Sequence, residues 1–323
     1  MKEISVTVYC SAYNHEKYIR DALEGFVKQK TNFDFEVIVH DDASTDGTAE
    51  IIKEYELKYP NIIKPIYQTE NQYSKGTNHV YSFYLPRTVG KYIALCEGDD
   101  YWTDPLKLQK QYDYMETHSD CSLVAHKAMT LYMDGNCIRP YTNYDFTDPK
   151  KCNITAEAIM DNHLIFPTAS MFFRKEYYLK NRDFLQKIKS FDYVTKFLLA
   201  TQGDVYVIPE VMSVYRYGSD GSWTNRVLKK PEEFKKHIEI AVRNLEMIDE
   251  YTDYCYHESI TKNILQRRFD ALVALQDISA IKLEPYNEIY HNKPLKWKLF
   301  LYAKKYVPFL AKVAIKMKNK LRK

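Results

Sequence analysis

Short apolar runs alternate with amphipathic segments along the first third of the chain. Runs rich in β-branched residues predict strands, and apolar residues that recur every three or four positions predict helices. The predicted strands cover residues 4–10, 35–39, 62–67 and 92–96, and the predicted helices cover 16–30 and 47–59. A further helix is predicted after a Gly-containing loop around residues 75–77. This alternation predicts an α/β fold whose mostly parallel central sheet is flanked by helices.

The second half of the chain is less regular. Strands are predicted at residues 122–125, 129–133, 137–138, 167–173 and 205–208, with a tight turn at 134–136. A helix is predicted to begin near Asp192, and residues 231–283 have a helical pattern. We therefore expect one α/β domain that carries a helical C-terminal extension.

The composition is that of a folded protein with a charge asymmetry. The 323 residues are 45% hydrophobic and 28% charged, so the chain can bury a substantial core. The formal net charge is +3, but residues 293–323 contain eleven Lys and Arg residues and no acidic residue. Without that tail, 35 basic residues face 43 acidic ones, so residues 1–292 carry a net charge of −8. An acidic body of this kind argues against a general nucleic-acid-binding protein.

Cysteine usage and the apolar runs indicate a cytoplasmic protein. Six cysteines are scattered without a C-x-x-C pair, which favours reduced core residues over a disulfide or a zinc site. The N-terminal Met-Lys-Glu leads directly into a predicted strand and does not resemble a signal peptide. No apolar run reaches the length of about 18 residues that a membrane-spanning helix needs.

Two acidic clusters directly follow predicted strands. Residues 41–46 (DDASTD) follow the strand at 35–39, and residues 97–100 (EGDD) follow the strand at 92–96. Ligands of parallel α/β sheets bind beyond the carboxyl ends of the strands. Closely spaced carboxylates repel one another unless a cation is present, and Mg²⁺ takes one or two carboxylates completed by substrate phosphates. Either cluster alone is typical of a polar turn or a helix cap, whereas the two together favour a metal site.

Three segments in a fixed order carry a resemblance to a known family. The segments SAYN at 11–14, VIVHDDASTDGT at 37–48 and YIALCEGDDYWTDPLKLQKQ at 92–111 resemble the inverting family 2 glycosyltransferases. The match covers residues 4–112, and the S-T-D-G-T and G-D-D-Y-W-T-D-P portions are typical of the bacterial surface-polysaccharide branch. The resemblance implies a GT-A-like fold, related to the Rossmann fold, and a nucleoside-diphosphate sugar donor. A UDP-sugar is the expected donor, with Mn²⁺ or Mg²⁺ as the cofactor.

The resemblance also assigns residues on the nucleotide side of the site. Ser11 and Tyr13 are expected beside the nucleobase, and Asp42 is expected to accept a hydrogen bond from a base N–H. Lys75, in the Gly-containing loop, is assigned to the same donor-binding set.

The second acidic cluster is assigned to the metal and the ribose. Asp99 and Asp100 match the family's metal and ribose carboxylates, and Asp100 is favoured as the direct metal ligand. Glu97 stands where many relatives carry the first Asp of the D-x-D motif, and its role stays open.

Two residues in the second half have two interpretations each. Asp192 falls where the family places its catalytic base, which takes the proton of the acceptor hydroxyl, but an Asp before a helix is also a common N-cap. Arg216 falls in a segment that relatives close over the diphosphate, but it could equally pair with a structural carboxylate. Many relatives carry a His two residues later, where this chain has Gly218.

The basic tail predicts a surface helix. Phe309, Leu310, Val313, Met317 and Leu321 recur at helical spacing among lysines. Such a segment can lie on an anionic membrane, and it can equally pack on a partner protein. In the first case the protein would be peripheral at the inner face of the plasma membrane.

We accordingly expect four regions and one function. Residues 1–112 form the donor half and 113–228 the acceptor and catalytic half of one GT-A domain, followed by a helical extension at 229–292 and the tail at 293–323. The expected function is a metal-dependent, inverting transfer of a sugar to a hydroxyl of a glycan or lipid-linked acceptor in surface polysaccharide synthesis. A sugar nucleotidyltransferase and a non-catalytic carbohydrate-binding protein remain as alternatives. Neither a G-x-G-x-x-G after the first strand nor a P-loop motif is present.

Overall fold

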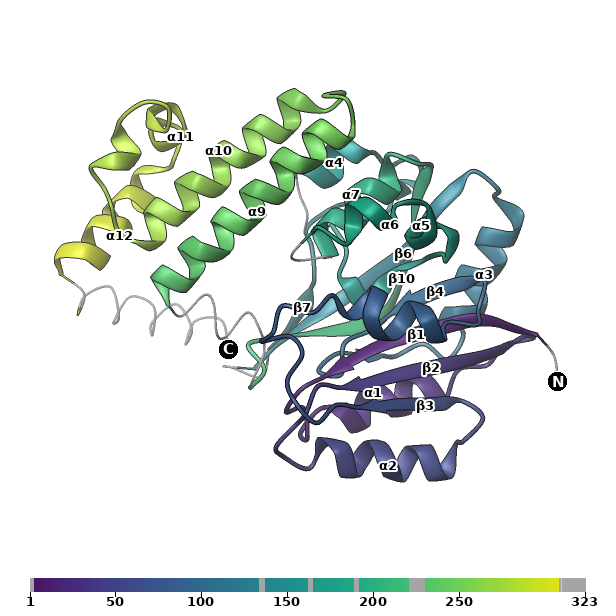
Figure 1. Cartoon of the computed structure of the whole chain (residues 1–323). Helices are drawn as coiled ribbons and strands as arrows, with labels where there is room; N and C mark the ends of the chain where they lie inside the picture. Colours follow the sequence, from purple (N-terminus) through teal and green to yellow (C-terminus); the bar gives the residue numbers. More distant parts are fainter. Residues whose placement is uncertain are drawn as a thin grey trace. The chain divides into compact units, whose positions relative to one another are not determined.

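The chain forms two compact units in the computed structural model (Figure 1). The structure describes residues 3–133, 137–161, 165–188, 192–220, 230–307 and 309. The first unit comprises Met1–Met133 and Ile138–Ser222, and the second comprises Asp134–Cys137 and Trp223–Lys323. The first unit contains the sheet, and the second is helical.

The strands and helices predicted for the first third of the chain are confirmed. The strands are β1 (Ile4–Ala12), β2 (Asp34–Asp41), β3 (Ile63–Tyr67) and β4 (Tyr92–Leu95), and the helices between them are α1 (Ile19–Val27) and α2 (Thr48–Lys58). The helix expected after residues 75–77 is a π-helical turn, η1 (Val80–Tyr84), followed by a 3₁₀ turn, η2 (Leu85–Arg87).

The sheet is mostly parallel, as predicted, and short antiparallel strands are added to it. The strand order is β3-β2-β1-β4-β9-β6-β10-β5, with β7 paired to β6 and β8 paired to β10. The later strands are β5 (Tyr101–Trp102), β6 (Cys121–Tyr132), β7 (Cys137–Pro140), β8 (Asn153–Ile154), β9 (Phe172–Arg174) and β10 (Asp204–Tyr217). Two groups of strands pair in parallel: the first contains β1, β2, β3 and β4, and the second contains β6 and β10. β9 lies between the two groups and pairs antiparallel with β4 and with β6. Because β9 runs antiparallel to both of its neighbours, β4 and β6 run in the same direction, and β10 runs parallel to β6. β4, β6 and β10 therefore all end at the same edge of the sheet.

Three predicted strands in the second half were wrong in their extent. The strands predicted at 122–125 and 129–133 form one continuous strand, β6, which ends at Tyr132. The strand predicted at 167–173 begins instead with a 3₁₀ turn, η4 (Thr168–Ser170). The backbone N–H and the hydroxyl of Ser170 both donate to the carbonyl of Pro167, at 3.1 and 2.7 Å, and this local bonding competes with a strand. The tight turn predicted at 134–136 lies outside the described residues.

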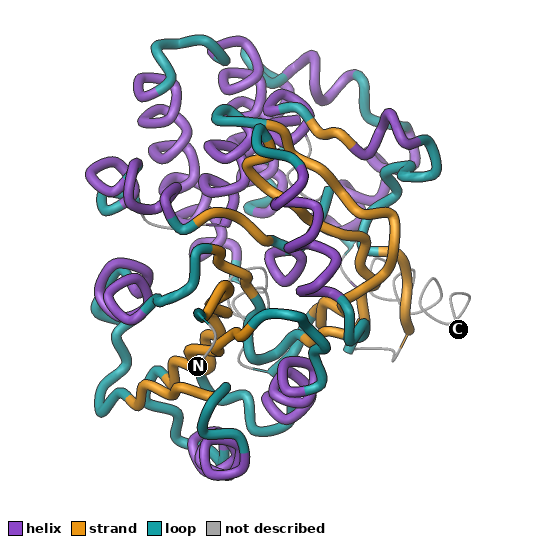
Figure 2. The backbone as a smooth tube through the Cα atoms, turned by 90° about the vertical axis from the view of Figure 1, so that its right-hand side faces the viewer, coloured by secondary structure: helices purple, strands orange, loops and turns teal. Residues whose placement is uncertain are grey.

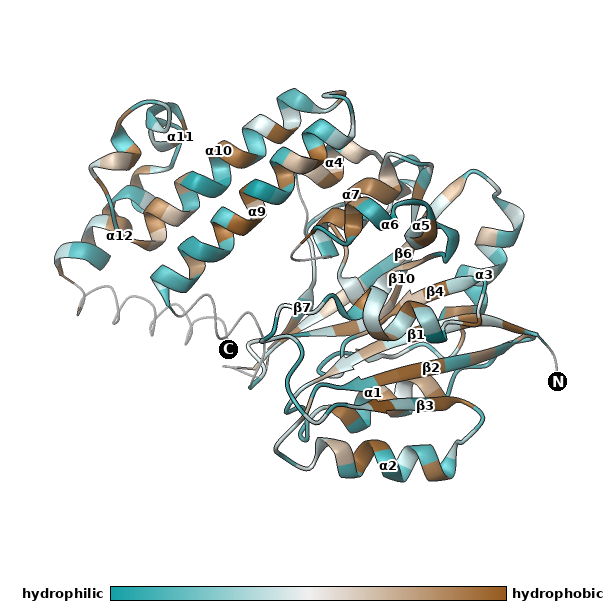
Figure 3. Ribbon diagram, in the orientation of Figure 1, coloured by the Kyte–Doolittle hydropathy of each residue, from teal (hydrophilic) through white to brown (hydrophobic). Residues whose placement is uncertain are grey.

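The core of the first unit lies between the sheet and its helices (Figure 2). The remaining helical elements of this unit are α3 (Lys107–Thr117), η3 (Pro149–Cys152), α4 (Ala156–Asp161), α5 (Glu176–Lys180), α6 (Arg182–Leu185) and α7 (Asp192–Ala200). Ile19, Leu23 and Phe26 of α1 are fully buried against the strands. Hydrophobic stretches run along β2 and α7 in Figure 3, where both elements are buried in the unit. The helix predicted to begin near Asp192 is confirmed as α7.

The second unit is built on two long helices, α9 (Pro231–Tyr251) and α10 (His257–Ala274), which pack together through Ile238, Val242 and Ala271. A second small core joins α10 to η5 (Ala280–Lys282), α11 (Asn287–His291) and α12 (Leu295–Tyr306). The helical pattern predicted at 231–283 is therefore confirmed, with a break where Asp253 and Tyr254 have φ angles of +49° and +59°. None of the described helices has the length and apolar character needed to cross a membrane.

Candidate functional site

The cluster Glu97–Asp100 lies at the carboxyl end of β4, beside the end of β1. The backbone N–H of Gly98 donates to the carbonyl of Ser11 at 2.8 Å, which joins the two strand ends. A Cβ atom at Gly98 would stand 2.8 Å from Cδ1 of Ile19 and 3.0 Å from Nδ1 of His15. The turn can therefore pack this closely only because residue 98 has no side chain.

Asp100 is a buried carboxylate with one backbone donor. Its side chain accepts a hydrogen bond from the backbone N–H of Arg216 at 2.8 Å, and the residue is only 2% exposed. Burial raises the pKa of Asp100 well above its usual range, and the negative charges of Asp99 and Glu97 raise it further. A cation beside this group would offset both effects.

Arg216, near the end of β10, connects this strand to the cluster. Its guanidinium donates to the backbone carbonyl of Asp99 at 2.8 Å and forms an ion pair with Asp21 of α1. The guanidinium also lies over the ring of Tyr101, 4.4 Å from the ring centre. The structure thus shows Arg216 paired with a structural carboxylate. Its contact with a diphosphate stays a prediction.

Asp99 is held from the same strand end. The hydroxyl of Ser219 donates to its carboxylate at 2.7 Å. Asp99 is more exposed than Asp100, so its remaining carboxylate oxygen can reach a ligand from the solvent side. Both acidic groups are consequently positioned by residues at the end of β10 and just after it, which are 116 and 120 positions away in the sequence.

Asp192 lies close enough to Glu97 for the two charges to interact. The pKa of Glu97 is raised to about 8, first by burial and then by the negative charges of Asp192 and Asp99, while the positive charge of Lys196 acts in the opposite direction. Asp192 is the exposed first residue of α7, and its carboxylate accepts a hydrogen bond from the Thr168 hydroxyl at 3.2 Å. This bond comes from a side chain of another element rather than from a backbone amide of α7.

Asp42, which is expected beside the nucleobase, follows β2 and is almost completely buried. Its carboxylate accepts hydrogen bonds from the backbone N–H groups of Gln72 and Tyr73, at 2.7 and 3.0 Å. An ionised carboxylate has about four acceptor positions, so two bonds leave capacity for a nucleobase N–H. Asp42 therefore also fixes residues 72–73, which lead into the Gly-containing loop around residues 75–77.

The other donor-binding candidates have different surroundings. The Ser11 hydroxyl shares a hydrogen bond of 2.7 Å with the hydroxyl of Tyr84, and Tyr13 is half-buried two residues further on. Lys75 lies on an exposed loop and forms its ion pair with Glu70. Among the described contacts, none brings Lys75 to the carboxylates at the end of β4. Donor binding by these three residues stays a prediction.

The arrangement fits a divalent ion that is completed by a ligand. Within the described part of the chain, no three His, Cys, Asp or Glu side chains form a ready-made metal site. Mg²⁺ and Mn²⁺ are commonly held by one or two carboxylates together with substrate phosphates, and Asp99 and Asp100 supply such a pair of oxygen donors. Burial, and after it the negative charges of Asp99 and Glu97, raise the pKa of Asp100, and a cation beside the carboxyl group would relieve these effects.

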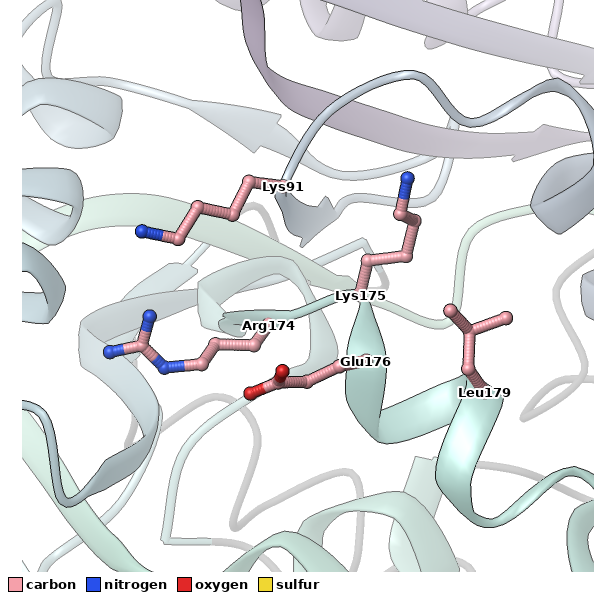
Figure 4. Close-up of a pocket in the computed structure, with 5 residues that line it drawn as sticks. All are labelled: Lys91, Arg174, Lys175, Glu176 and Leu179. Carbon is pink, nitrogen blue, oxygen red and sulfur yellow. The ribbon is translucent and has the colours of Figure 1, made fainter.

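A separate surface pocket lies at the opposite end of β4 (Figure 4). It is lined by Lys91, Arg174, Lys175, Glu176 and Leu179. Its cationic groups are already engaged, because Lys91 pairs with Glu116 at 2.7 Å and Arg174 donates to the Tyr92 hydroxyl at 2.9 Å. We do not assign the chemistry of the acidic cluster to this pocket.

Sequence reasoning missed several residues around the carboxylates. Asp21 forms an ion pair with Arg216, and Ser219 donates a hydrogen bond to Asp99. Thr168 donates a hydrogen bond to Asp192. Lys196 is buried one helical turn after Asp192, a spacing that a search for pairs at i and i+4 would have found. Tyr141 also lies near the cluster. Burial raises the pKa of its hydroxyl most, Tyr215 raises it next, and the charges of Asp100, Asp192 and Glu97 raise it further.

Comparison with known sequences gives a consistent picture. The family model described as glycosyl transferase family 2 matches residues 7–182, more than half of the chain. An uncharacterized protein of Mycobacterium tuberculosis is 34% identical over 218 residues, which cover 68% of this chain and 60% of the relative. The chain thus spans less than two thirds of the length of that relative. The poly(ribitol-phosphate) beta-N-acetylglucosaminyltransferase TarS of Staphylococcus aureus is 27% identical over 231 residues, which cover 65% of this chain and 38% of TarS.

Solved structures share the fold. The S. aureus TarS 1–349 complex with UDP-GlcNAc has a TM-score of 0.53 at 18% identity and covers 86% of this chain and 84% of that one. The mannosyltransferase PcManGT from Pyrobaculum calidifontis, in complex with GDP-Man and Mn²⁺, has a TM-score of 0.57 at 18% identity. This second match covers 99% of this chain and 88% of the other. At these identities the likeness shows that the chain has the GT-A fold.

Proposed function

The chain belongs to glycosyl transferase family 2, and we propose that it transfers a sugar from a nucleoside-diphosphate donor to an acceptor hydroxyl with inversion. The observation that carries the proposal is that Asp192 shares its electrostatic neighbours with the acidic cluster at the end of β4: Glu97 interacts with Asp192 and Asp99, and Tyr141 interacts with Asp192 and Asp100. The donor is proposed to be a UDP-sugar and the cofactor Mn²⁺ or Mg²⁺. The neighbours solved with UDP-GlcNAc and with GDP-Man and Mn²⁺ support this choice of ligand class.

In the proposed mechanism the pair Asp99 and Asp100 has one role and Asp192 has another. Asp99 and Asp100 would hold the divalent ion, which would stabilise the charge that develops on the leaving diphosphate. Asp192 accepts the proton of the acceptor hydroxyl as the acceptor oxygen attacks the anomeric carbon from the face opposite the diphosphate. Ser11, Tyr13 and Asp42 orient the nucleoside, and Arg216 fixes the position of Asp99 and Asp100.

The regions of the chain follow from these roles. Residues 1–112 would bind the donor, and residues 113–228, which contain Asp192, would bind the acceptor. The acceptor is proposed to be a glycan or a lipid-linked glycan of a surface polysaccharide, which the resemblance of the S-T-D-G-T segment to that branch supports. A sugar nucleotidyltransferase is disfavoured, because the end of β1 and the turn that follows it read SAYN at residues 11–14 and lack the Gly, Lys and Arg residues of a triphosphate loop.

The proposal is tested by binding a panel of nucleotide sugars in the presence and absence of Mn²⁺. A ligand present at 100 times its Kd adds about 2.7 kcal/mol to the free energy of unfolding. We expect one UDP-sugar to raise the Tm only when the metal is present, and to be hydrolysed slowly under the same conditions. Stabilisation by a nucleoside triphosphate and a sugar phosphate instead would favour the nucleotidyltransferase. Failure of the whole panel would leave the carbohydrate-binding alternative.

We also propose that α12 contributes to binding an anionic membrane surface. Leu295, Leu299 and Tyr306 form one stripe of this helix and are 72%, 61% and 65% exposed. Lysines flank the stripe at positions 296, 298, 304 and 305. Exposed apolar groups flanked by cations suit the interface of an anionic bilayer, to which each Lys adds about 1 kcal/mol. The rest of the predicted tail, from residue 310, lies outside the described residues.

Replacing Leu295 and Leu299 together by serine should weaken sedimentation of the full chain with vesicles that contain anionic lipid. Raising the salt from about 0.1 M to 1 M shortens the Debye length from about 10 Å to 3 Å, so it should weaken the binding of the unchanged protein as well. Leu57→Ser is the matched control, because Leu57 is an 83% exposed leucine on α2. If all three proteins stay in the supernatant at low salt, α12 does not bind membranes and a partner protein becomes the better explanation.

A further inference from the structure

Lys196 is a buried lysine one helical turn after the proposed base. Residues four apart lie on the same face of a helix, so Lys196 and Asp192 share one face of α7. Asp192 is exposed at the start of the helix, whereas Lys196 is only 6% exposed. The carboxylate therefore reaches the solvent side of the site while the ammonium group lies behind it, inside the protein.

Both side chains are bonded to the same short segment. The Lys196 ammonium donates to the carbonyl of Phe166 at 2.8 Å, and the Thr168 hydroxyl donates to Asp192 at 3.2 Å. The next residue of this segment is bonded as well, because the indole of Trp102 donates to the carbonyl of Ala169 at 2.9 Å. Trp102 stands two positions after Asp100. The first turn of α7 is thus fixed to the same framework as the metal-binding cluster.

The buried ammonium group faces two carboxylates. A buried charge is costly unless opposite charges and hydrogen bonds compensate it. Burial lowers the pKa of Lys196 to about 8, and the negative charges of Asp192 and Glu97 act in the opposite direction. Lys196 is accordingly positively charged below about pH 8, which includes the whole range in which a carboxyl group normally titrates.

We propose that Lys196 is a positioning residue for Asp192, and that its buried positive charge, one helical turn further along the same face of α7, favours the ionised form of the Asp192 carboxyl group. The effect of Lys196 on turnover rests on the proposed role of Asp192 as base, but its effect on the charge of Asp192 does not. Among the described residues, the titratable groups that interact electrostatically with Asp192 are Lys196, Glu97, Tyr141 and Tyr178. Lys196 is the only cation of these four, so its removal should raise the pKa of Asp192 rather than lower it.

Three variants of the full chain test the proposal. Lys196→Met removes the charge and keeps the length of the side chain, and Lys196→Arg keeps the charge. Lys107→Met is the matched control, because Lys107 is also fully buried but donates to Gln111 at 2.7 Å and lies over the Trp102 ring. Where Lys196→Met does not fold, Lys196→Gln replaces it, since a glutamine is neutral and can still donate to the Phe166 carbonyl.

The first readout is the pKa of Asp192 itself, measured in the free protein by ¹³C NMR with labelled aspartate carboxyl carbons. The Asp192→Asn variant identifies the signal. Removing a nearby positive charge raises the pKa of a carboxyl group by about 1 unit or more, so Lys196→Met should show an increase of that size. Lys196→Arg and Lys107→Met should leave the pKa of Asp192 unchanged. An unchanged pKa in Lys196→Met would mean that the lysine only satisfies the Phe166 carbonyl, and the proposal would fail.

The second readout is the pH dependence of UDP-GlcNAc hydrolysis with Mn²⁺. Loss of activity on acidification should begin about 1 pH unit higher in Lys196→Met, so its rate should be about tenfold lower than that of the unchanged protein on the acid limb. The two rates should converge toward pH 8. A purely structural role would lower the rate equally at every pH. If the pKa of Asp192 moves but Asp192→Asn hydrolyses at the normal rate, Lys196 still controls the charge of Asp192 and only the base role is refuted.

Discussion

Replacing Asp100 by asparagine is expected to reduce sugar transfer by about 10³-fold or more and to remove the dependence on Mn²⁺. A metal ion stabilises the transition-state charge by several kcal/mol, and about 4 kcal/mol corresponds to 10³ in rate. The asparagine can still accept the hydrogen bond that the backbone N–H of Arg216 donates at 2.8 Å. Burial, followed by the charges of Asp99 and Glu97, raises the pKa of Asp100, and the neutral asparagine avoids both costs, so the fold should be retained.

The measurement for Asp100→Asn is the transfer rate over a range of Mn²⁺ concentrations, with the Tm recorded beside it. Asp220→Asn is a suitable control, since Asp220 also follows β10 and forms an exposed ion pair with Lys17 at 2.8 Å. It should keep both the rate and the metal dependence. Full turnover of the unchanged protein in excess EDTA would exclude a metal-dependent mechanism.

Replacing Asp192 by asparagine is expected to reduce transfer by roughly 10²–10⁴-fold, the usual contribution of a general base. Donor binding should stay nearly unchanged, because Asp192 lies on α7 and not among the residues assigned to the nucleotide. The asparagine keeps the size of the side chain and an acceptor for the Thr168 hydroxyl, so the start of α7 should be preserved.

The readout for Asp192→Asn separates kcat from the donor Kd. Asp183→Asn provides the control, as Asp183 is an exposed carboxylate in the first turn of α6. A transfer rate equal to that of the unchanged protein would assign Asp192 a structural role, and another group would then have to accept the proton. Transfer by the unchanged protein should also decline at acid pH, because a protonated carboxyl group cannot act as the base.

The regular elements of the first third could be predicted from local sequence alone. The β-branched runs of β1, β2 and β4 are buried on both faces, so their apolar residues are continuous and easily recognised. The placement of acidic residues directly after β2 and β4 then predicted where a ligand would bind, because parallel strands end at a common edge. The three-part resemblance added the family, which the match over residues 7–182 confirms.

Local sequence was a poor guide where short-range hydrogen bonds compete with strand formation. Residues 167–173 are apolar enough to predict a strand, yet Ser170 bonds back to Pro167 and only the end of the segment joins the sheet as β9. The antiparallel insertion of β9 between β4 and β6 was also not predicted, since periodicity carries no information about strand direction.

The amino-acid sequence by itself determined which residue types stand at the ends of β2 and β4, and therefore the kind of ligand that this edge can bind. Only the tertiary structure decided what holds those groups in place. The ion pair of Arg216 with Asp21 joins residues 195 positions apart, and the bond of Thr168 to Asp192 spans 24. Contacts at such separations depend on the order and direction of the strands in the sheet. For the same reason the burial of Lys196 behind Asp192 became visible only once α7 was packed against the rest of its unit.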